Sequence, residues 1–250
     1  MTILFRHNLS VSALAVFMLL SLAGCQTPGT DAVTPDSDSD QPALPLRALG
    51  QEPGWILQMD DEQLQLDYQY GQHQFSAPTP EASMEGDIIR YNARADGETL
   101  FVEIKPGYCE DIMSGRPFPY TVEITINGEL LRGCGGDTQS LLVDRLWAVE
   151  DINGRALVDD TPLTLSFDTD HRVSGSAGCN RFNGRYEITG EGVSFGPLAL
   201  TRRACEAALM QQESDMMKVL EGASNFRLDN SGALIIRGYR GQSLRATTQN

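Results

Sequence analysis

Short segments in which apolar and polar residues alternate make up much of this 250-residue chain. The clearest of them are residues 87–94, 99–105, 120–126, 163–167, 186–188 and 193–195. Alternation with a period of two places every second side chain on one face, as in a β-strand with one buried face. Asn127-Gly128, between Ile126 and Glu129, is typical of a two-residue hairpin turn. The pattern therefore predicts a mainly β protein.

The distribution of charge divides this β-rich part of the chain in two. Residues 45–138 contain 16 acidic and 6 basic residues, a net charge of −10, whereas residues 139–250 contain 14 acidic and 12 basic residues, a net charge of −2. We therefore predict two small β-rich domains with these bounds. In the first domain we expect no helix, and a loop at residues 71–86 because this segment is polar and contains proline.

A helical pattern occurs in the second predicted domain. Apolar residues recur at helical spacing from Leu209 to Leu220, and Gly222 stands where a helix commonly ends. We interpret the methionines of this stripe as core residues. Strands are expected at residues 141–152, 225–228, 233–236 and 243–246. One helix among these strands places the second domain in the α+β class.

The N-terminus has the features of an export signal. Arg6 and His7 precede residues 9–23, a largely apolar stretch that is shorter than the ~20 residues of a membrane-spanning helix. It ends in Leu22-Ala23-Gly24-Cys25, which resembles the lipobox of bacterial lipoproteins. We expect residues 1–24 to be a signal peptide and Cys25 to be lipidated. An ordinary secretory signal is the alternative.

The lipid on Cys25 would anchor the chain to a membrane. By resemblance to sorted lipoproteins, Gln26 favours the outer membrane of a Gram-negative bacterium, with the protein facing the periplasm. Residues 25–44 are rich in proline and aspartate and have no apolar pattern, so we expect a disordered linker.

Four further cysteines constrain both domains. They are Cys109, Cys134, Cys179 and Cys205. An exported chain enters an oxidising compartment, where an even number of cysteines indicates disulfides. Four cysteines permit three pairings, and pairing within each predicted domain favours Cys109–Cys134 and Cys179–Cys205. Each bond would stabilise its domain by about 3.5 kcal/mol on the chain-entropy model. Zinc binding and a redox role are the alternatives, although no C-x-x-C motif is present.

Composition argues against several classes of function. The acidic charge and the presence of only two lysines argue against a nucleic-acid partner, because phosphate binding depends on basic residues. His73 and His171 fall in different predicted domains, and no nucleophile-elbow, dinucleotide-binding or metalloprotease motif occurs. Glu110-Asp111 is interpreted as an acidic turn rather than a catalytic pair. We predict no enzymatic activity, no cofactor and no metal.

The second domain contains the strings L-W-x-V at 146–149, G-C-N-x-F-x-G-x-Y at 178–186 and T-R-x-A-C at 201–205. In these strings it resembles the META domain, the HslJ-like family of bacterial lipoproteins. The resemblance implies a curled antiparallel sheet or a split barrel with one packed helix. The family motif residues are Trp147, Gly178, Asn180, Phe182, Gly184, Tyr186, Thr201 and Arg202. Glu206-Ala207-Ala208 departs from the proline-rich helix entry of the family, which affects the start of the helix.

The first domain contains the strings G-x-E-P-x-W, which ends at Trp55, and C-x-D-x-M-S-G, which contains Asp111. In these strings it resembles a region of uncharacterised proteobacterial lipoproteins. Gly54 departs from this pattern, which usually has an aromatic residue after the proline.

These resemblances imply a non-enzymatic envelope lipoprotein with a role in stress tolerance or envelope maintenance, acting through contacts with an envelope protein or a surface. The alternative, from likeness to secretin pilot lipoproteins, is a groove for a hydrophobic ligand or an acyl chain, with Met210, Met216 and Met217 as its lining. A third interpretation, inhibition of a cationic partner such as a lysozyme, rests on the charge of −10 in residues 45–138.

Overall fold

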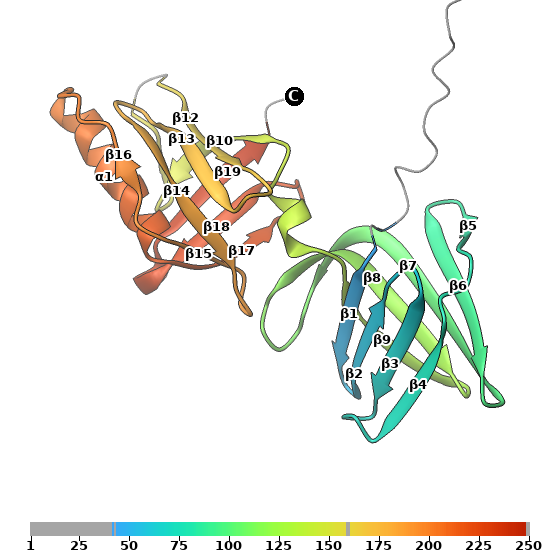
Figure 1. Ribbon diagram of the computed structural model, residues 1–250. Helices are drawn as coiled ribbons and strands as arrows, with labels where there is room; N and C mark the ends of the chain where they lie inside the picture. The colour runs from blue at the N-terminus through green and yellow to red at the C-terminus, as the bar shows by residue number, and fades with distance from the viewer. Residues whose placement is uncertain (1–41, 43, 159–160, 249–250) are drawn as a thin grey trace, which may run out of the picture. The chain divides into compact units, whose positions relative to one another are not determined.

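The computed structural model describes residue 42 and residues 44–158 and 161–248. The predicted signal peptide, Cys25 and nearly all of the predicted linker lie outside the described residues. The described residues form two antiparallel sheets and one α-helix, so the fold is mainly β, as the alternation predicts (Figure 1). No helix of the described residues has the length and apolar character that a membrane crossing requires.

The first sheet is curled and has the strand order β4-β3-β2-β1-β9-β8-β7-β6-β5 (Figure 1). Alternating side chains such as Leu57, Leu64 and Leu66 face a shared core and are fully buried. Burial of one such side chain contributes about 1.5–3 kcal/mol. The strands are β1 (Leu46–Gln51), β2 (Gly54–Met59), β3 (Gln63–Tyr68), β4 (His73–Pro78), β5 (Ser83–Glu85), β6 (Ile88–Ala95), β7 (Glu98–Glu110), β8 (Pro117–Ile126) and β9 (Glu129–Gly135).

The turn predictions for this sheet have different outcomes. Asn127 and Gly128 both have positive φ and join β8 to β9 with Ile126 opposite Glu129, which confirms the two-residue hairpin. The loop expected at residues 71–86 is wrong, because this segment contains β4 and β5. In β4 only Phe75 and Ala77 are buried, so the strand contains too few apolar residues to show a clear alternation. All three residues of β5 are exposed, so β5 has no apolar pattern.

The second sheet is nearly closed into a barrel (Figure 1). Its order is β15-β14-β13-β12-β10-β19-β18-β17, and the two end strands also contact each other. β11 pairs with β10, and β16 pairs with β14. The strands are β10 (Leu146–Ile152), β11 (Arg155–Ala156), β12 (Leu163–Phe167), β13 (Arg172–Ala177), β14 (Arg181–Ile188), β15 (Val193–Phe195), β16 (Ala199–Leu200), β17 (Ala223–Leu228), β18 (Leu234–Gly238) and β19 (Ser243–Thr248).

The strand expected at residues 141–152 begins later than the sequence indicates. A short 3-10 helix, η1 (Thr138–Leu141), comes first, and β10 starts at Leu146. Leu142 and Val143 are buried in the core of the second sheet without belonging to a strand. These two apolar residues lengthen the predicted strand because the sequence does not distinguish a buried loop residue from a strand residue.

The helix α1 (Ala207–Glu221) confirms the helical pattern, with Gly222 as its C-cap. Its N-cap residue, Glu206, makes no side-chain capping hydrogen bond, in keeping with the unusual sequence at this point. The helix packs against strands β10, β13, β15, β18 and β19, and covers the core of the second sheet.

Both disulfides join the predicted partners. The Cys109–Cys134 and Cys179–Cys205 pairs have Cα–Cα distances of 5.6 and 6.1 Å, within the usual range for disulfides. Each bond lies within the region of one sheet, β7 with β9 in the first, and the β13–β14 turn with the segment before α1 in the second.

A glycine on β13 tests how closely the second sheet is packed. A Cβ at Gly175 would collide with the Thr164 carbonyl oxygen and lie 2.9 Å from the Phe182 ring. We expect Gly175→Ala to lower the free energy of unfolding by about 1–3 kcal/mol, because neither neighbour has room to move. Chemical denaturation measures this change.

Gly190→Ala is the matched control in the same domain. No atom lies within 4 Å of a Cβ at Gly190, so we expect a change within about 0.5 kcal/mol. Equal stability of the two variants would contradict the close packing at Gly175.

Candidate functional site

Asn180 is the centre of a buried polar network in the second domain. It lies in the turn between β13 and β14 and is 4% exposed. Its backbone N–H donates to Oε2 of Glu213 at 3.0 Å, and its side-chain amide donates to Oε1 of the same carboxylate at 3.2 Å. Glu213 belongs to α1, so these two bonds fix the helix against the turn. A buried carboxylate needs such donors, because burial without them is costly.

The same asparagine also fixes the segment that leads into the helix. Its Oδ1 accepts hydrogen bonds from the Thr201 hydroxyl at 2.8 Å and from the Arg203 backbone N–H at 2.7 Å. Its Nδ2 additionally contacts the Arg203 carbonyl oxygen at 3.2 Å. The Cys179–Cys205 disulfide lies beside these contacts and joins the same two segments covalently. The G-C-N and T-R-x-A-C strings therefore bind each other through Asn180 and through the disulfide. We call this set of contacts, together with those to Glu213, the Asn180 clamp.

The remaining motif residues of this domain pack in the core or shape turns. Trp147 is fully buried, and its indole N–H donates to the Leu142 carbonyl at 2.9 Å. Phe182 and Tyr186 are buried on the same face of β14. The remaining placements are Gly178 at a φ of +93°, Gly184 with no room for a Cβ beside Leu198, and Arg202 exposed.

Tyr186 is held at both ends. Its ring packs edge-on against Phe167, with 5.1 Å between the two ring centroids. Its hydroxyl donates to the Asp168 carbonyl and accepts from the Gln139 amide, both at 2.7 Å. Burial raises the pKa of the Tyr186 hydroxyl, against the opposing effect of the Gln139 bond. The hydroxyl therefore stays protonated and serves as a fixed hydrogen-bonding group.

The methionines of α1 do not gather on one pocket wall. Met216 and Met217 are buried in the core of the second sheet, whereas Met210 is 46% exposed. A small hollow of about 130 Å³ beside the helix is lined by other residues, including Gln212 and Asp215. The three residues predicted to line a groove are thus divided between the core and the surface.

In the first domain, Trp55 packs over two glycines. A Cβ at Gly50 or at Gly133 would meet the indole ring, and the indole N–H donates to the Arg132 carbonyl at 3.3 Å. Trp55 is 3% exposed and belongs to the core. The first glycine and the tryptophan of the G-x-E-P-x-W string are therefore opposite each other on β1 and β2 and pack as a unit.

Asp111 shapes the loop between β7 and β8. One carboxylate oxygen accepts from the Ser114 backbone N–H at 2.9 Å and from the Ser114 hydroxyl at 2.5 Å, and the other accepts from the Gln51 amide at 3.0 Å. Burial disfavours the charged form, but these hydrogen bonds outweigh it and lower the pKa of Asp111. The acidic turn that the sequence indicates is thus a structural device, and the Gln51 contact across 60 residues is one that no local pattern reveals.

Two large apolar side chains stand at the end of this loop. Ile112 is 77% exposed and Met113 is 72% exposed. The Cys109–Cys134 disulfide lies just before this loop, and Asp111, the first residue of the loop, bonds to Ser114 within it and to Gln51 on β1. Exposed apolar groups on a fixed loop are typical of a contact surface.

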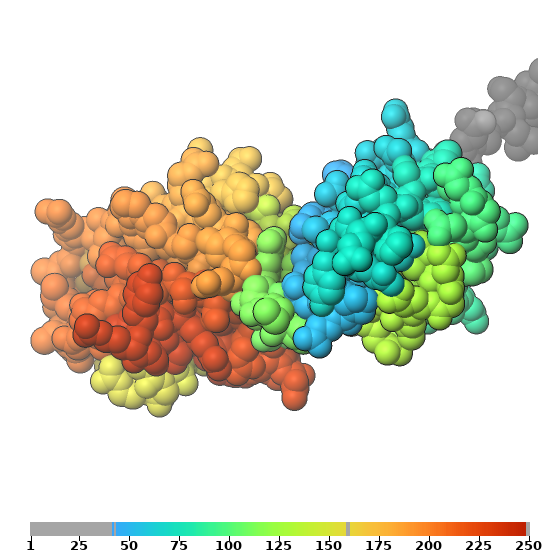
Figure 2. Space-filling model, turned by 90° about the horizontal axis from the view of Figure 1, so that it is seen from below, coloured from blue at the N-terminus to red at the C-terminus, as the bar shows by residue number. Residues whose placement is uncertain are grey.

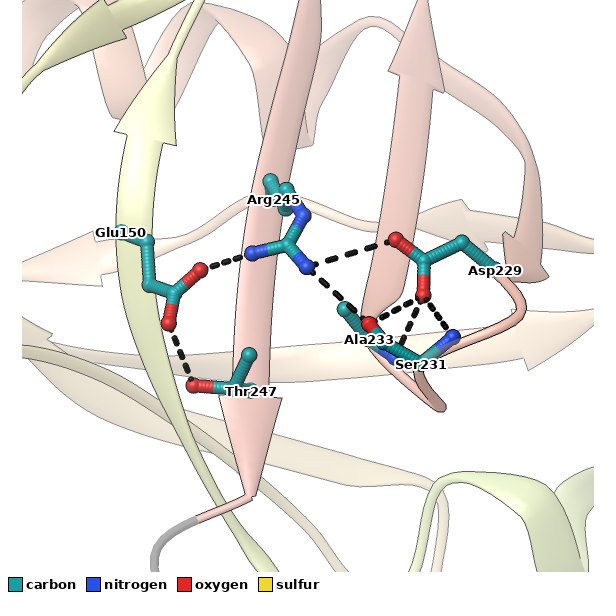
Figure 3. Close-up of polar contacts among 6 residues, drawn as sticks. All are labelled: Glu150, Asp229, Ser231, Ala233, Arg245 and Thr247. Atoms are coloured by element: carbon teal, nitrogen blue, oxygen red, sulfur yellow. Dashed lines mark hydrogen bonds and ion pairs between the residues drawn. The ribbon is translucent and has the colours of Figure 1, made fainter.

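A charged network on the outer face of the second sheet is self-contained. Arg245 on β19 pairs with Glu150 on β10 and with Asp229 in the turn after β17, as Figure 3 shows. Asp229 accepts from the Ser231 hydroxyl and backbone N–H at 2.6 and 2.8 Å, which lowers its pKa. These groups satisfy one another and hold the β17–β18 turn to the sheet.

The two histidines of the described chain are not brought together. His73 stacks on Tyr68 in the first sheet, whereas His171 lies in the turn between β12 and β13 of the second. Within residues 44–158 and 161–248, no group of three His, Cys, Asp or Glu residues has an arrangement that could hold a metal ion.

Comparison with protein families bears on the second domain. Residues 140–250 match the model of the META domain. This part of the chain is a META domain. The Asn180 clamp, the Cys179–Cys205 disulfide and helix α1 therefore all belong to the META domain. The match does not extend to the first domain, whose resemblance to lipoprotein regions stays a prediction.

Two solved structures are similar to the chain. One is an NMR structure of a protein from Burkholderia xenovorans, with 26% identity and a TM-score of 0.40, covering 45% of this chain and 86% of that chain. The other, also an NMR structure, has 26% identity and a TM-score of 0.37, and covers 44% of this chain and 93% of that chain. No curated protein matches the chain.

The hydrogen bonds of Asp111 predict a pH dependence of stability. Its folded pKa lies below the unfolded value of about 3.9, so its contribution is complete at neutral pH and is lost as the pH falls through the folded pKa. We expect Asp111→Asn to destabilise the chain at pH 7, and the difference from the native chain to shrink below about pH 4. Denaturation midpoints measured across this range test the prediction.

Asp87→Asn removes an exposed carboxyl of the same domain and controls for the change in net charge. A difference between the native chain and Asp111→Asn that stays constant down to pH 3 would contradict a charged, hydrogen-bonded Asp111.

Proposed function

We propose that the protein is a non-enzymatic lipoprotein of the cell envelope. In this proposal Cys25 carries the lipid that anchors the chain to the outer membrane, and the two domains face the periplasm. The protein supports envelope maintenance or stress tolerance through contacts with an envelope protein or a surface. The META domain supports this family of roles, because the resemblance to HslJ-like lipoproteins lies in that domain.

The observation that carries the proposal is the exposed pair Ile112 and Met113 on its braced loop. A disulfide and a buried carboxylate both hold this loop, which lowers the entropy lost when a partner binds. The Asp and Ser of the C-x-D-x-M-S-G string build the loop, and its Met stands exposed at the end. A loop that is held by hydrogen bonds and a disulfide, and that exposes two apolar side chains, is suited to bind a partner protein or surface.

The META motif residues support the same interpretation. Asn180, Thr201 and Glu213 each use their polar atoms on neighbouring parts of the chain. Because these polar atoms are bonded within the domain, the motif residues determine its shape, and contacts with a partner would be made by other, exposed side chains.

The experiment compares envelope-stress survival of a deletion strain that carries the native chain, Cys25→Ser or the double variant Ile112→Ser/Met113→Ser. We expect the native chain to incorporate palmitate, fractionate with the outer membrane and restore survival. Cys25→Ser should lose the lipid and the membrane fraction. The double variant should keep both but lose the survival benefit, because the contact surface is removed.

Met84→Ser/Leu130→Ser is the matched control, since these side chains are 42% and 44% exposed elsewhere on the first sheet. It should behave like the native chain. Full survival with the Ile112/Met113 variant would contradict the contact role of the loop, and palmitate on Cys25→Ser would contradict the anchor.

A further inference from the structure

Tyr70 has an unusual conformation for an aromatic residue. Gln69 and Tyr70 follow one another with φ of +49° and +59°, a region that bulky side chains rarely adopt. The Tyr70 ring is nevertheless 72% exposed, so burial of the ring does not compensate for this conformation. Strain of this kind persists where the surrounding structure imposes it, and it often marks a functional position.

The first sheet fixes this tyrosine from below. The Tyr70 backbone N–H donates to the Gly54 carbonyl at 2.9 Å. The nearest ring atom, Cδ1, lies only 2.7 Å from the position that a Cβ of residue 54 would take. Gly54 has no Cβ and therefore leaves the space that the Tyr70 ring occupies beside β2. In this position the tyrosine is 72% exposed to solvent.

The ring borders a hollow of about 460 Å³ on the outer face of β1, β2 and β3. Leu49, Ile56 and Asp67 lie side by side across these strands and form part of its floor. Arg47 and Gln51 line it from β1. This volume falls within the range of about 300–1,000 Å³ that is common for small-molecule sites.

A second hollow of about 390 Å³ adjoins the first and shares Arg47 with it. Its lining is rich in side-chain amides, from Gln58, Gln63 and Gln65. Together the two hollows form a track over β1 to β3. The part of the chain that contains these strands is blue to cyan in Figure 2.

The chemistry of this track differs from that of the rest of the domain. Residues 45–138 have a net charge of −10, yet the two hollows combine Arg47 with Asp60 and Asp67 and at least four glutamine amides. Amides donate and accept hydrogen bonds, Arg only donates and Asp only accepts.

Some of these groups already bond within the domain: the Gln51 amide donates to Asp111, the Gln63 amide donates to Ser76, and one carboxylate oxygen each of Asp60 and Asp67 accepts from neighbouring residues. The groups left for a ligand are the Arg47 guanidinium, the Gln58 and Gln65 amides, the Gln51 amide oxygen and the second carboxylate oxygens. A ligand hydroxyl can bond each of them, because it donates and accepts at once.

We infer that this track binds a neutral, unbranched oligosaccharide. The apolar face of one pyranose ring stacks on Tyr70 above Ile56, and its hydroxyls bond Arg47, Gln51 and Asp67. The following sugars extend over the second hollow, where Gln58 and Gln65 bind their hydroxyls. This binding activity goes beyond the proposed contact role and does not depend on the lipid anchor.

Calorimetric titration of the purified full chain with cellotetraose and with chitotetraose tests the inference. We expect at least one of them to bind with a millimolar or lower dissociation constant that is insensitive to salt, because the ligand is uncharged. Tyr70→Ala should weaken binding about tenfold or more, and Gln58→Ala should weaken it by a smaller factor.

Tyr239→Ala is the matched control, since Tyr239 is 70% exposed in the second domain and should leave binding unchanged. Thermal unfolding of each variant confirms that it is folded. Absence of binding by both oligosaccharides at millimolar concentration would overturn the inference. An equal loss in Tyr70→Ala and Tyr239→Ala would overturn it as well, because it would indicate unspecific stacking on exposed tyrosines.

Discussion

The pairing of Glu213 with Asn180 is the contact on which the second domain depends. It places a carboxylate that is 7% exposed against an amide that is 4% exposed, and it joins the helix to a turn of the sheet. A helix on a nearly closed barrel could otherwise slide, since apolar contacts between Met216, Leu220 and the core have no direction. Directed hydrogen bonds fix one position, and the Cys179–Cys205 disulfide ties the adjoining segments together.

The first domain uses the same principle with a different residue. Asp111 accepts hydrogen bonds from Ser114 and from Gln51, and a disulfide lies beside it. In both domains, therefore, a disulfide and a hydrogen-bonded carboxylate fix a turn to a neighbouring part of the chain, in addition to the hydrogen bonds of the sheet. Buried motif residues fix these turns through hydrogen bonds, and exposed side chains such as Ile112, Met113 and Tyr70 are available to other molecules.

Local patterns predict much of this fold. Alternation identifies strands such as β7 and β8, Asn127-Gly128 identifies a hairpin, and Gly222 identifies the end of the helix. The pairing of cysteines follows from their division between two domains. By contrast, β4 has a polar outer face and no residue of β5 is buried, so neither strand stands out in the sequence.

Long-range contacts explain what the sequence does not reveal about the candidate sites. Gln51 reaches Asp111 across 60 residues, and Glu213 reaches Asn180 across 33, so neither pair has a local signature. The Tyr70 track likewise forms only when three strands align their outer faces. Met210, Met216 and Met217 show the reverse case, because their helical spacing indicates three core residues. Met216 and Met217 are buried as expected, whereas Met210 is 46% exposed.

A double-mutant cycle on Asn180 and Glu213 tests most directly whether this pairing holds the META domain together. The free energy of unfolding is measured for the native chain, Asn180→Ala, Glu213→Ala and the double variant, with the exposed Asn183→Ala as a control for the loss of an amide on β14. The account predicts a coupling energy of about 1–3 kcal/mol and a control close to the native chain. Additive effects of the two substitutions, within about 0.5 kcal/mol, would contradict it.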